Sequence, residues 1–446
     1  MKNFALLLFL ALLITACGKG RISSNNQDSV FTGVALSTSA DTGFVSIIEP
    51  LIPDRIITVG GNRADINGFT SEAIQTAIDA LNLKGGGRVV LQEGLFDIKA
   101  PVRLYSNISL SGAGPNTILR KCDGYRSPFS LDADYGELKI EVNDPAGFST
   151  GMGVAVFDDD NRGGWDVTTA RITAIMGKTI YLDTYLLRDY RSDRNGMLSN
   201  ACSVIEAFDA VNIHVASLAV DGNRATNDLV DGCREGGIYL HRVSNSLIEN
   251  LVVRNFNCDG ISWQTTEHIT VRNCEVTGCA NAGLHPGTGS PFTIIEGNDC
   301  HGNDHYGLFV CWRVRDGFVR NNKFRNNGVN GICTGHKDTN MIFEGNEISG
   351  NGEDGIHLRG ETDLNAPHGS VFSGNTFTDN GLANGGYGIS VNSKAKNVII
   401  KDNTFVNTAR GRQKAAIYLM KNSLDPLVSG NTLTGMPDGE IVRETK

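Results

Sequence analysis

The second half of this 446-residue chain repeats a short segment at a nearly constant spacing. A glycine followed by an apolar residue recurs at intervals of 23, 24, 24, 24 and 33 residues. These glycines are Gly260, Gly283, Gly307, Gly331, Gly355 and Gly388. A fixed period with short alternating strands and Asn/Gly turns is typical of a solenoid of stacked β-strand coils. The spacing therefore predicts an all-β fold, a parallel β-helix, over residues 206–446.

An asparagine also recurs with the repeat, at a second position in each coil. The recurring residues are Asn298, Asn322, Asn346, Asn375, Asn403 and Asn431. Side-chain amides stacked at one corner can hydrogen-bond to one another along the stack, as they do in other repetitive β structures. We expect such a ladder here.

Residues 51–129 fit the first coils and a cap. Thr70 precedes apolar residues at helical spacing up to Leu81, which predicts a short amphipathic helix. Such a helix would close the open end of the solenoid and cover its exposed strand edge. Residues 130–205 break the repeat and alternate in a strand pattern, which predicts an inserted β subdomain.

The first residues predict an export signal. Lys2 precedes a short apolar run over residues 4–14, too short for a membrane span. The small residues before Cys17 resemble the lipobox of bacterial lipoproteins, which implies a signal peptide of residues 1–16 and a lipid on Cys17. Residues 17–50 would then begin with a polar tether. The expectation is a lipoprotein of the bacterial cell envelope, held to the membrane on its periplasmic or outer side.

The charge balance indicates which partners to expect. The net charge of -9 argues against nucleic acid, although a local basic patch can still bind an anion. Nine cysteines remain beside Cys17 and no CxxC pair occurs, so we predict neither a zinc site nor a disulfide framework, at most one or two bridges. The acidic run at residues 158–161 is read as a surface loop, with Ca²⁺ binding as the alternative. No other cofactor is expected.

The regular period also predicts which side chains share a column on the outside of the solenoid, because strand residues alternate inward and outward. The first column contains His285, Phe309, Cys333 and His357. The following columns contain Gly287, Cys311, Gly335 and Arg359, then Gly289, Arg313, Lys337 and Glu361, with Trp312 and His336 between them. Earlier coils add Tyr239, His241, Ser262 and Gln264.

Like charges on neighbouring rungs repel, by up to about 1 kcal/mol each. Arg313 and Lys337 occupy such neighbouring rungs, with His336 beside them, which favours a groove that binds a ligand. The candidate catalytic residues are His285, Arg313, His336, Lys337 and His357. The candidate substrate-binding residues are His241, Gln264, Trp312, Asp338, Arg359 and Glu361.

The N-terminal helix with the two strand-like segments after it resembles the pectate-lyase-like, right-handed parallel β-helix superfamily. Within it, the segments AGLHPGTGS, NGICTGHKDTN and DGIHL are most similar to catalytic coils of mannuronan C5-epimerases and related polysaccharide lyases. Leu284-His285-Pro286-Gly287 stands where those enzymes carry Asp-Pro-His. The resemblance implies a right-handed parallel β-helix as the fold and a linear, uronate-containing polysaccharide as the substrate.

Epimerisation and β-elimination share one first step, removal of the proton next to a uronate carboxylate. Arg313 and Lys337 would bind the carboxylate, and His285 or His336 would act as the base. Lys337 could be the base instead if its neighbour lowers its pKa. His357 and Arg359 would bind the next sugar unit.

Two further readings remain open. A glycoside hydrolase needs two carboxyl groups, for which Asp338 and Glu361 on neighbouring rungs are candidates. A non-catalytic glycan-binding surface lipoprotein could instead use Trp312, Tyr239 and Phe309 as stacking platforms.

Overall fold

The computed structural model describes residues 45–408, 411–421 and 423–445. The chain divides into two units, Met1–Thr42 and Gly43–Lys446. The predicted signal peptide, Cys17 and most of the predicted tether lie outside the described residues.

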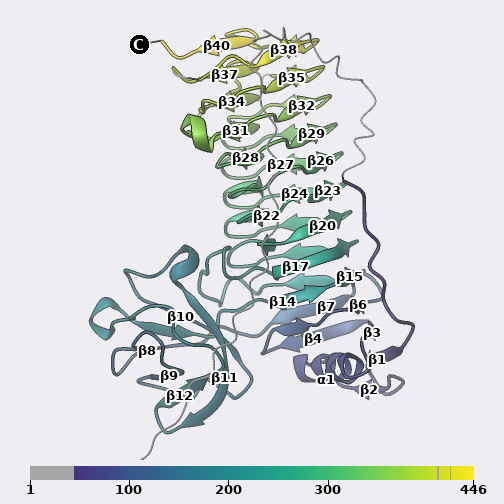
Figure 1. Cartoon of the computed structure of the whole chain (residues 1–446), viewed down its shortest axis with the longest axis vertical. Helices are drawn as coiled ribbons and strands as arrows, with labels where there is room; N and C mark the ends of the chain where they lie inside the picture. The colour runs from purple at the N-terminus through teal and green to yellow at the C-terminus, as the bar shows by residue number, and fades with distance from the viewer. Residues whose placement is uncertain (1–44, 409–410, 422, 446) are drawn as a thin grey trace, which may run out of the picture. The chain divides into compact units, whose positions relative to one another are not determined.

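Residues 56–443 wind into a right-handed parallel β-helix whose coils are stacked in Figure 1. The first of its three faces consists of β5 (Val102–Leu104), β14 (Ile205–Val211), β17 (Ile238–Glu249), β19 (Ile261–Gln264), β22 (Ala282–Gly287), β25 (Tyr306–Phe309), β28 (Ile332–Thr334), β31 (Ile356–Leu358), β34 (Ile389–Val391), β37 (Ile417–Leu419) and β40 (Ile441–Arg443). All pairings within this face are parallel, so the fold predicted from the repeat is confirmed.

The second face continues from the first around a bend. It consists of β1 (Ile56–Gly60), β2 (Ile66–Asn67), β3 (Gly87–Leu91), β6 (Ile108–Ser111), β15 (His214–Ala216), the end of β17, β20 (Glu267–Arg272), β23 (Ile294–Glu296), β26 (Phe318–Arg320), β29 (Ile342–Glu344), β32 (Val371–Ser373), β35 (Ile399–Lys401) and β38 (Leu427–Ser429). The third face consists of β4 (Gly94–Ile98), β7 (Thr117–Lys121), β16 (Ala219–Asp221), β18 (Val252–Arg254), β21 (Glu275–Thr277), β24 (Asp299–His301), β27 (Lys323–Arg325), β30 (Glu347–Ser349), β33 (Thr376–Thr378), β36 (Thr404–Val406) and β39 (Thr432–Thr434).

The apolar residue after each repeat glycine points into the helix. Leu284, Leu308 and Ile332 stack on successive coils and are fully buried. The preceding position requires glycine because the coils approach closely there. A Cβ on Gly283 would lie 2.8 Å from the carbonyl oxygen of Gly307. The repeat therefore reflects two structural requirements. The apolar residue fills the core, and the glycine allows the close backbone contact between coils.

The predicted asparagine ladder is present. Each Nδ2 from Asn298 to Asn403 donates to the Oδ1 of the next asparagine and to a main-chain carbonyl inside the coil. The structure adds a second ladder that was not predicted from the sequence. It runs through Asn303, Asn327, Asn351, Asn380 and Gln413. The ladder residues from Asn298 to Asn403 and from Asn303 to Gln413 are buried, and these hydrogen bonds satisfy their side-chain amides within the stack.

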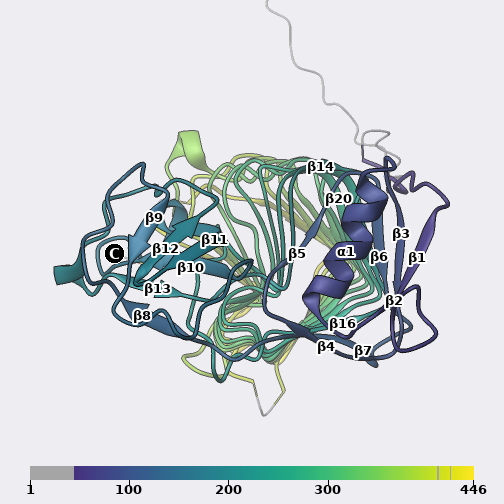
Figure 2. The same cartoon turned by 90° about the horizontal axis from the view of Figure 1, so that it is seen from below.

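Helix α1 (Ser71–Asn82) lies across the N-terminal end of the β-helix in Figure 2. The Thr70 side chain caps it by accepting a hydrogen bond from the Ala73 amide. Ile74, Ile78 and other apolar residues of one helix face are buried against the first coils. The predicted capping helix is therefore confirmed.

A six-stranded antiparallel sheet interrupts the β-helix between β7 and β14. It consists of β8 (Arg126–Pro128), β9 (Lys139–Glu141), β10 (Gly153–Phe157), β11 (Thr168–Met176), β12 (Thr179–Leu182) and β13 (Met197–Ser199). Short 3₁₀ helices occur at Gly164–Asp166, Ser192–Arg194 and Asp363–Asn365. The sheet has a hydrophobic core of its own, in which Val154, Ile172 and Leu198 are buried. We call this sheet and its loops the inserted subdomain.

Candidate functional site

The outward side chains of the first face form the column that the 24-residue spacing predicts. Strand register places Ser262 beside His285, and Phe309 beside Cys333. From β5 to β31 the column contains Arg103, Glu206, Tyr239, Ser262, His285, Phe309, Cys333 and His357. Neighbouring rungs lie about 4.8 Å apart, so these groups follow one line along the helix.

Residues 222–237, the loop between β16 and β17, cover part of this column. Ser262 Oγ donates to the carbonyl oxygen of Gly232 at 2.6 Å. His285 is consequently only 3% exposed, and Gln264 is fully buried. The sequence-based assignment of these two residues to an open groove is wrong, because the period describes the strands and not the loop that lies over them.

His285 belongs to a buried polar cluster under this loop. Its Nδ1 lies 2.6 Å from Oδ2 of Asp259, whose Oδ1 accepts a hydrogen bond from Asn281. Burial opposes protonation of His285, but the Asp259 carboxylate raises the pKa of His285 to about 10. Cys233 and Cys311 complete the cluster. A hydrogen bond from the Cys233 thiol, together with His285, lowers the pKa of Cys311 to about 5.

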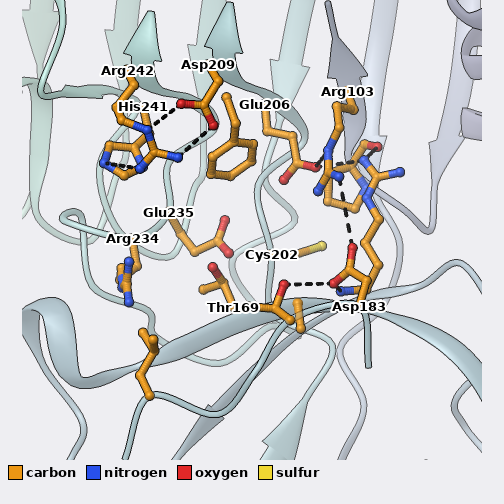
Figure 3. A pocket seen from close by; sticks show the side chains of 16 residues that line it. Arg103, Thr169, Asp183, Cys202, Glu206, Asp209, Arg234, Glu235, His241 and Arg242 are labelled. Atoms are coloured by element: carbon orange, nitrogen blue, oxygen red, sulfur yellow. Dashed lines mark hydrogen bonds and ion pairs between the residues drawn. The ribbon is translucent and has the colours of Figure 1, made fainter. Parts of the chain in front are cut away.

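A pocket of about 390 Å³ lies between the early coils of the first face and the inserted subdomain (Figure 3). We call it the arginine pocket because four guanidinium groups line it. Its charged or titratable lining residues are Arg103, Arg171, Asp183, Cys202, Glu206, Asp209, Arg234, Glu235, His241 and Arg242. Of the candidate site residues from the sequence, only His241 lines it.

Glu206 on β14 joins the two walls of the arginine pocket. Its Oε1 accepts hydrogen bonds from Arg103 Nε at 2.8 Å and from Arg171 Nη2 at 2.7 Å. Arg171 belongs to β11 of the inserted subdomain and also donates to the Pro101 carbonyl at 2.7 Å. The Arg171 Nε is buried and has no hydrogen-bond partner among the described residues.

Glu235 reaches into the arginine pocket from the 222–237 loop, as Figure 3 shows. Its Oε2 accepts hydrogen bonds from the amide and the hydroxyl of Ser203. Burial, followed by the nearby charge of Glu206, raises the pKa of Glu235 to about 8. At neutral pH the Glu235 carboxyl is therefore mainly protonated and can donate a proton.

His241 lines the same pocket. Burial and the charges of Arg242 and Arg234 lower its pKa to about 4, so the imidazole is neutral at neutral pH. Arg242 Nη1 is 3.3 Å from Nδ1 and 3.5 Å from Nε2, while its other nitrogens are bound by Asp209. The Trp165 ring lies 5.5 Å from the imidazole, between centroids. A weakly bound neutral imidazole of this kind can accept a proton.

A second group of candidate residues lies farther along the same face. The Trp312 ring is half-exposed and its centroid is 4.8 Å from that of His336. His336 Nδ1 lies 3.2 Å from Glu361 Oε1. Arg313 and Lys337 are exposed, both with φ near 60°. We call these five residues the Trp312 group, and the structure brings them together as the spacing predicts.

Asp338 and Arg359 form hydrogen bonds within the coils of the β-helix. Asp338 is fully buried, where its carboxylate accepts hydrogen bonds from the amides of Val314 and Gly335. Arg359 donates to main-chain carbonyls, to Val310 at 2.9 Å and to that of Cys311. The proposed hydrolase pair of Asp338 with Glu361 is wrong, because Asp338 cannot reach a substrate. Arg359 is likewise occupied within the fold.

His357 is half-buried on the first column. Its Nδ1 contacts Asp354 Oδ2 at 3.1 Å and Ser390 Oγ at 2.8 Å. This places it in a polar network on the coil that also carries Glu361, and it does not line the arginine pocket.

The acidic run at residues 158–161 forms a loop in which Asp158 Oδ1 accepts hydrogen bonds from the amides of Asp160 and Asn161. The Asp158 carboxylate therefore forms hydrogen bonds within the loop, as expected for a surface loop. Among the described residues, no helix is long and apolar enough to cross a membrane.

The sequence reasoning missed most of the arginine pocket. Glu206, Arg103 and Glu235 lie on irregular coils before the 24-residue period begins, and Arg171 lies in the inserted subdomain. The one available signal was the charged dipeptide Arg234-Glu235, placed directly before the glycines that open β17.

Comparison with solved structures shows the fold. The A-modules of the mannuronan C-5 epimerases AlgE6 and AlgE4 from Azotobacter vinelandii are each 16% identical, with TM-scores of 0.52 and 0.50. The two alignments cover 84% and 83% of this chain and 95% of each module. PfbA, a surface adhesin of Streptococcus pneumoniae, is 15% identical with a TM-score of 0.53, over 88% of this chain and 93% of PfbA.

Comparison with curated protein sequences gives no significant match. Two family models match the chain. The right-handed β-helix region covers residues 260–433. A second model, described as rhamnogalacturonase A/epimerase, pectate lyase-like, covers residues 57–308, which is more than half of the chain. Together with the parallel coils and the capping helix, this match identifies the chain as a member of the pectate lyase-like rhamnogalacturonase A/epimerase family.

Proposed function

We propose that the protein acts on a linear, uronate-containing polysaccharide by removing the proton next to the carboxylate. The observation that carries this proposal is the pairing of Glu235 and His241 in one arginine-lined pocket. Burial keeps the first protonated and the second neutral, with pKa values of about 8 and about 4. An acid and a base with pKa values moved apart by their surroundings are typical of proton-transfer sites.

The substrate carboxylate would bind to donors that the fold leaves free. Within the described ranges, Arg171 Nε is buried and has no hydrogen-bond partner. The guanidinium of Arg234 lies over the Trp165 ring and uses Nε and Nη2 for main-chain carbonyls, which directs its remaining nitrogen elsewhere. Guanidinium donors also stabilise the charge that develops on the carboxylate when the neighbouring proton leaves.

In β-elimination, His241 would take the proton from C5 of the uronate. The electron pair of that bond forms the C4–C5 double bond, and the bond from C4 to the glycosidic oxygen breaks. Glu235 would give its proton to the departing oxygen, and both groups then exchange protons with water. In C5-epimerisation the same abstraction occurs, and a proton returns to the opposite face of C5.

A linear polymer along the first face would extend from the arginine pocket toward the Trp312 group. His241, Gln264 and Gly287 occupy consecutive rungs, and Cys311 follows on the next coil. Gln264, Gly287 and Cys311 are buried, so the polymer would pass over the 222–237 loop without contacting these three residues. Three rung spacings correspond to roughly 14 Å, about the length of three sugar units. Trp312 would then stack on a sugar remote from the reacting bond.

A panel of uronate polymers tests this proposal. Absorbance of the unsaturated product reports β-elimination, and incorporation of deuterium at C5 in heavy water reports abstraction with or without bond cleavage. Glu235→Gln should abolish elimination while the fold and polymer binding persist. Polymer binding without absorbance or deuterium incorporation on any substrate would contradict the proposal and leave the adhesin reading.

A glycoside hydrolase is the second candidate, because Glu206 and Glu235 form a carboxyl pair in the same pocket. The charge of Glu206 contributes to the raised pKa of Glu235, which places the two groups close together. In this reaction Glu235 again protonates the leaving oxygen, and Glu206 acts as base or nucleophile. New reducing ends without unsaturated product would favour hydrolysis over elimination.

We also propose that the mature chain is anchored in the bacterial envelope through a lipid on Cys17. The support is the short apolar run and the small residues before that cysteine. Incorporation of labelled fatty acid into the wild type, and its loss in Cys17→Ser, would support this anchor. A soluble, unlabelled wild-type protein would contradict it.

A further inference from the structure

Three potential metal ligands from separate parts of the chain meet beneath the 222–237 loop. They are the Sγ of Cys233 in that loop, His285 on β22, and the Sγ of Cys311 directly after β25. Their ligand atoms lie within 4.8 Å of one another. Around a tetrahedral zinc ion, such atoms lie roughly 3.6 to 3.8 Å apart, so a small closure of the loop would bring them to binding distance.

The orientation of His285 points to a missing ligand. Asp259 binds its Nδ1 at 2.6 Å, which fixes the ring and its tautomer. Asp259 is itself held by the Asn281 amide at 2.7 Å and the Ala282 main-chain amide at 2.8 Å. The Nε2 atom on the other side of the ring is buried and has no hydrogen-bond partner in the part of the chain that the structure describes. A carboxylate on one imidazole nitrogen and a free second nitrogen is the usual arrangement of a metal-binding histidine.

We propose that Cys233, His285 and Cys311 bind one divalent transition metal ion, most suitably Zn²⁺, with Asp259 orienting the histidine. Two thiolates and one imidazole are ligands that zinc accepts and that calcium and magnesium do not. Three protein ligands leave the fourth tetrahedral position to water or another small ligand. The spacing of these ligands, 52 and 26 residues, matches no short sequence motif.

A disulfide between Cys233 and Cys311 is the alternative to a metal ion. It accounts for fewer features of the buried cluster. It would join the same loop to the same coil, but it would leave the buried Nε2 of His285 without a partner. A metal ion satisfies that nitrogen and both sulfurs together. The cluster therefore favours the metal over the disulfide.

The metal would fix the position of the arginine pocket. Cys233 directly precedes Arg234 and Glu235, so a bond from its sulfur to the metal would tie both pocket residues to β22 and β25. This consequence rests on the function proposed above, whereas metal binding itself does not.

The test is metal binding by the full chain, purified under reducing conditions and freed of metal with a chelator. We expect one equivalent of Zn²⁺ per chain. Co²⁺ should give the visible bands of a tetrahedral site and near-ultraviolet thiolate-to-cobalt charge-transfer bands. His285→Ala and Cys311→Ser should each weaken binding by at least about 100-fold, which is within the range of ligand loss. Cys333→Ser is the matched control, because Cys333 lies on the same outward column but outside the ligand cluster.

Cys233→Ser serves as the second ligand variant if a core variant fails to fold, since it changes a loop residue. Circular dichroism checks the fold of every variant. A Cys233–Cys311 disulfide in the freshly isolated protein, detected by peptide mass spectrometry, would overturn the proposal. Cobalt spectra unchanged by all three ligand variants would do the same. Metal binding with no turnover of any polymer would instead contradict the proposed function and leave the metal site intact.

Discussion

Arg171 in the inserted subdomain donates a hydrogen bond of 2.7 Å to Glu206 on the β-helix, and Arg103 donates to the same oxygen at 2.8 Å. One carboxylate thus holds one guanidinium group from β5 and one from the inserted subdomain. The partners are largely buried, with Glu206 only 5% exposed. These hydrogen bonds hold together the two walls of the arginine pocket, which are the early coils of the first face and the inserted subdomain.

Arg171→Ala should remove this link and one donor for the substrate. Loss of one partner from a buried charge network typically costs about 3 to 5 kcal/mol of unfolding free energy. Because Arg103 still pairs with Glu206, we expect the lower end of that range, with kcat/KM reduced at least about 100-fold. Urea denaturation and initial rates measure the two effects. Arg191→Ala, at an exposed ion pair with Asp193, is the control and should change neither.

The activity should depend on pH through the two groups of the pocket. His241 is the base in its neutral form, which is available above its pKa of about 4. Glu235 is the acid in its protonated form, which is lost above its pKa of about 8. We therefore expect kcat/KM to be level between these values and to fall outside them. A rate that rises above pH 8 would show that Glu235 acts as a base and contradict its assignment.

Glu235 should make a contribution to stability that decreases with rising pH. Glu235 has an ordinary pKa of 4.5 when unfolded and about 8 when folded, so the folded state holds the extra proton between these values. The contribution of Glu235 to the free energy of unfolding is then complete below about pH 4.5. It falls between about pH 4.5 and pH 8, by at most about 1.4 kcal/mol for each pH unit. Urea denaturation across this range measures the slope. The lowered pKa of His241 and the raised pKa of His285 add slopes of their own in this range, so the contribution of Glu235 is the slope of the wild type minus that of Glu235→Gln. Equal slopes in the two proteins would contradict it.

Trp312→Ala tests whether the polymer follows the first face. Loss of an exposed aromatic contact of about 0.5 to 1.5 kcal/mol corresponds to a rise in KM of about 2- to 13-fold. The rise should occur for long polymers and be absent for short oligomers that fill only the arginine pocket. An equal change for both lengths would place the reacting sugar at Trp312 itself. Tyr418→Ala, farther along the same face, serves as the control.

Asn346→Ala should destabilise the β-helix without affecting the site. Asn346 Nδ2 donates to Asn375 Oδ1 and to the Val319 carbonyl, and its Oδ1 accepts from Asn322. Leaving such buried partners unsatisfied costs about 1 to 3 kcal/mol for each group. Thermal unfolding should report a loss of that size, with kcat/KM unchanged at a temperature where the variant is folded. Asn82→Ala, at an exposed position outside the ladders, gives the baseline.

The period of the sequence determined the regular coils. Gly283, Gly307 and Gly331 recur because a Cβ would collide with the next coil, and the apolar residue after each must fill the same interior layer. The same repetition predicts the ladder from Asn298 to Asn431 and the gathering of Trp312 with His336. Each of these contacts joins equivalent positions on neighbouring coils, so sequence spacing translates directly into spatial distance.

Only the tertiary structure decided what covers the coils. His285 has the outward position that its spacing predicts, but the 222–237 loop buries it, and Cys233 of that loop reaches Cys311 there. Arg171 and Glu235 meet at a pocket although one belongs to the inserted subdomain and the other to the loop. Neither segment repeats, so no period relates its residues to the column beneath. Their positions follow from packing between segments distant in sequence, which a one-dimensional spacing does not encode.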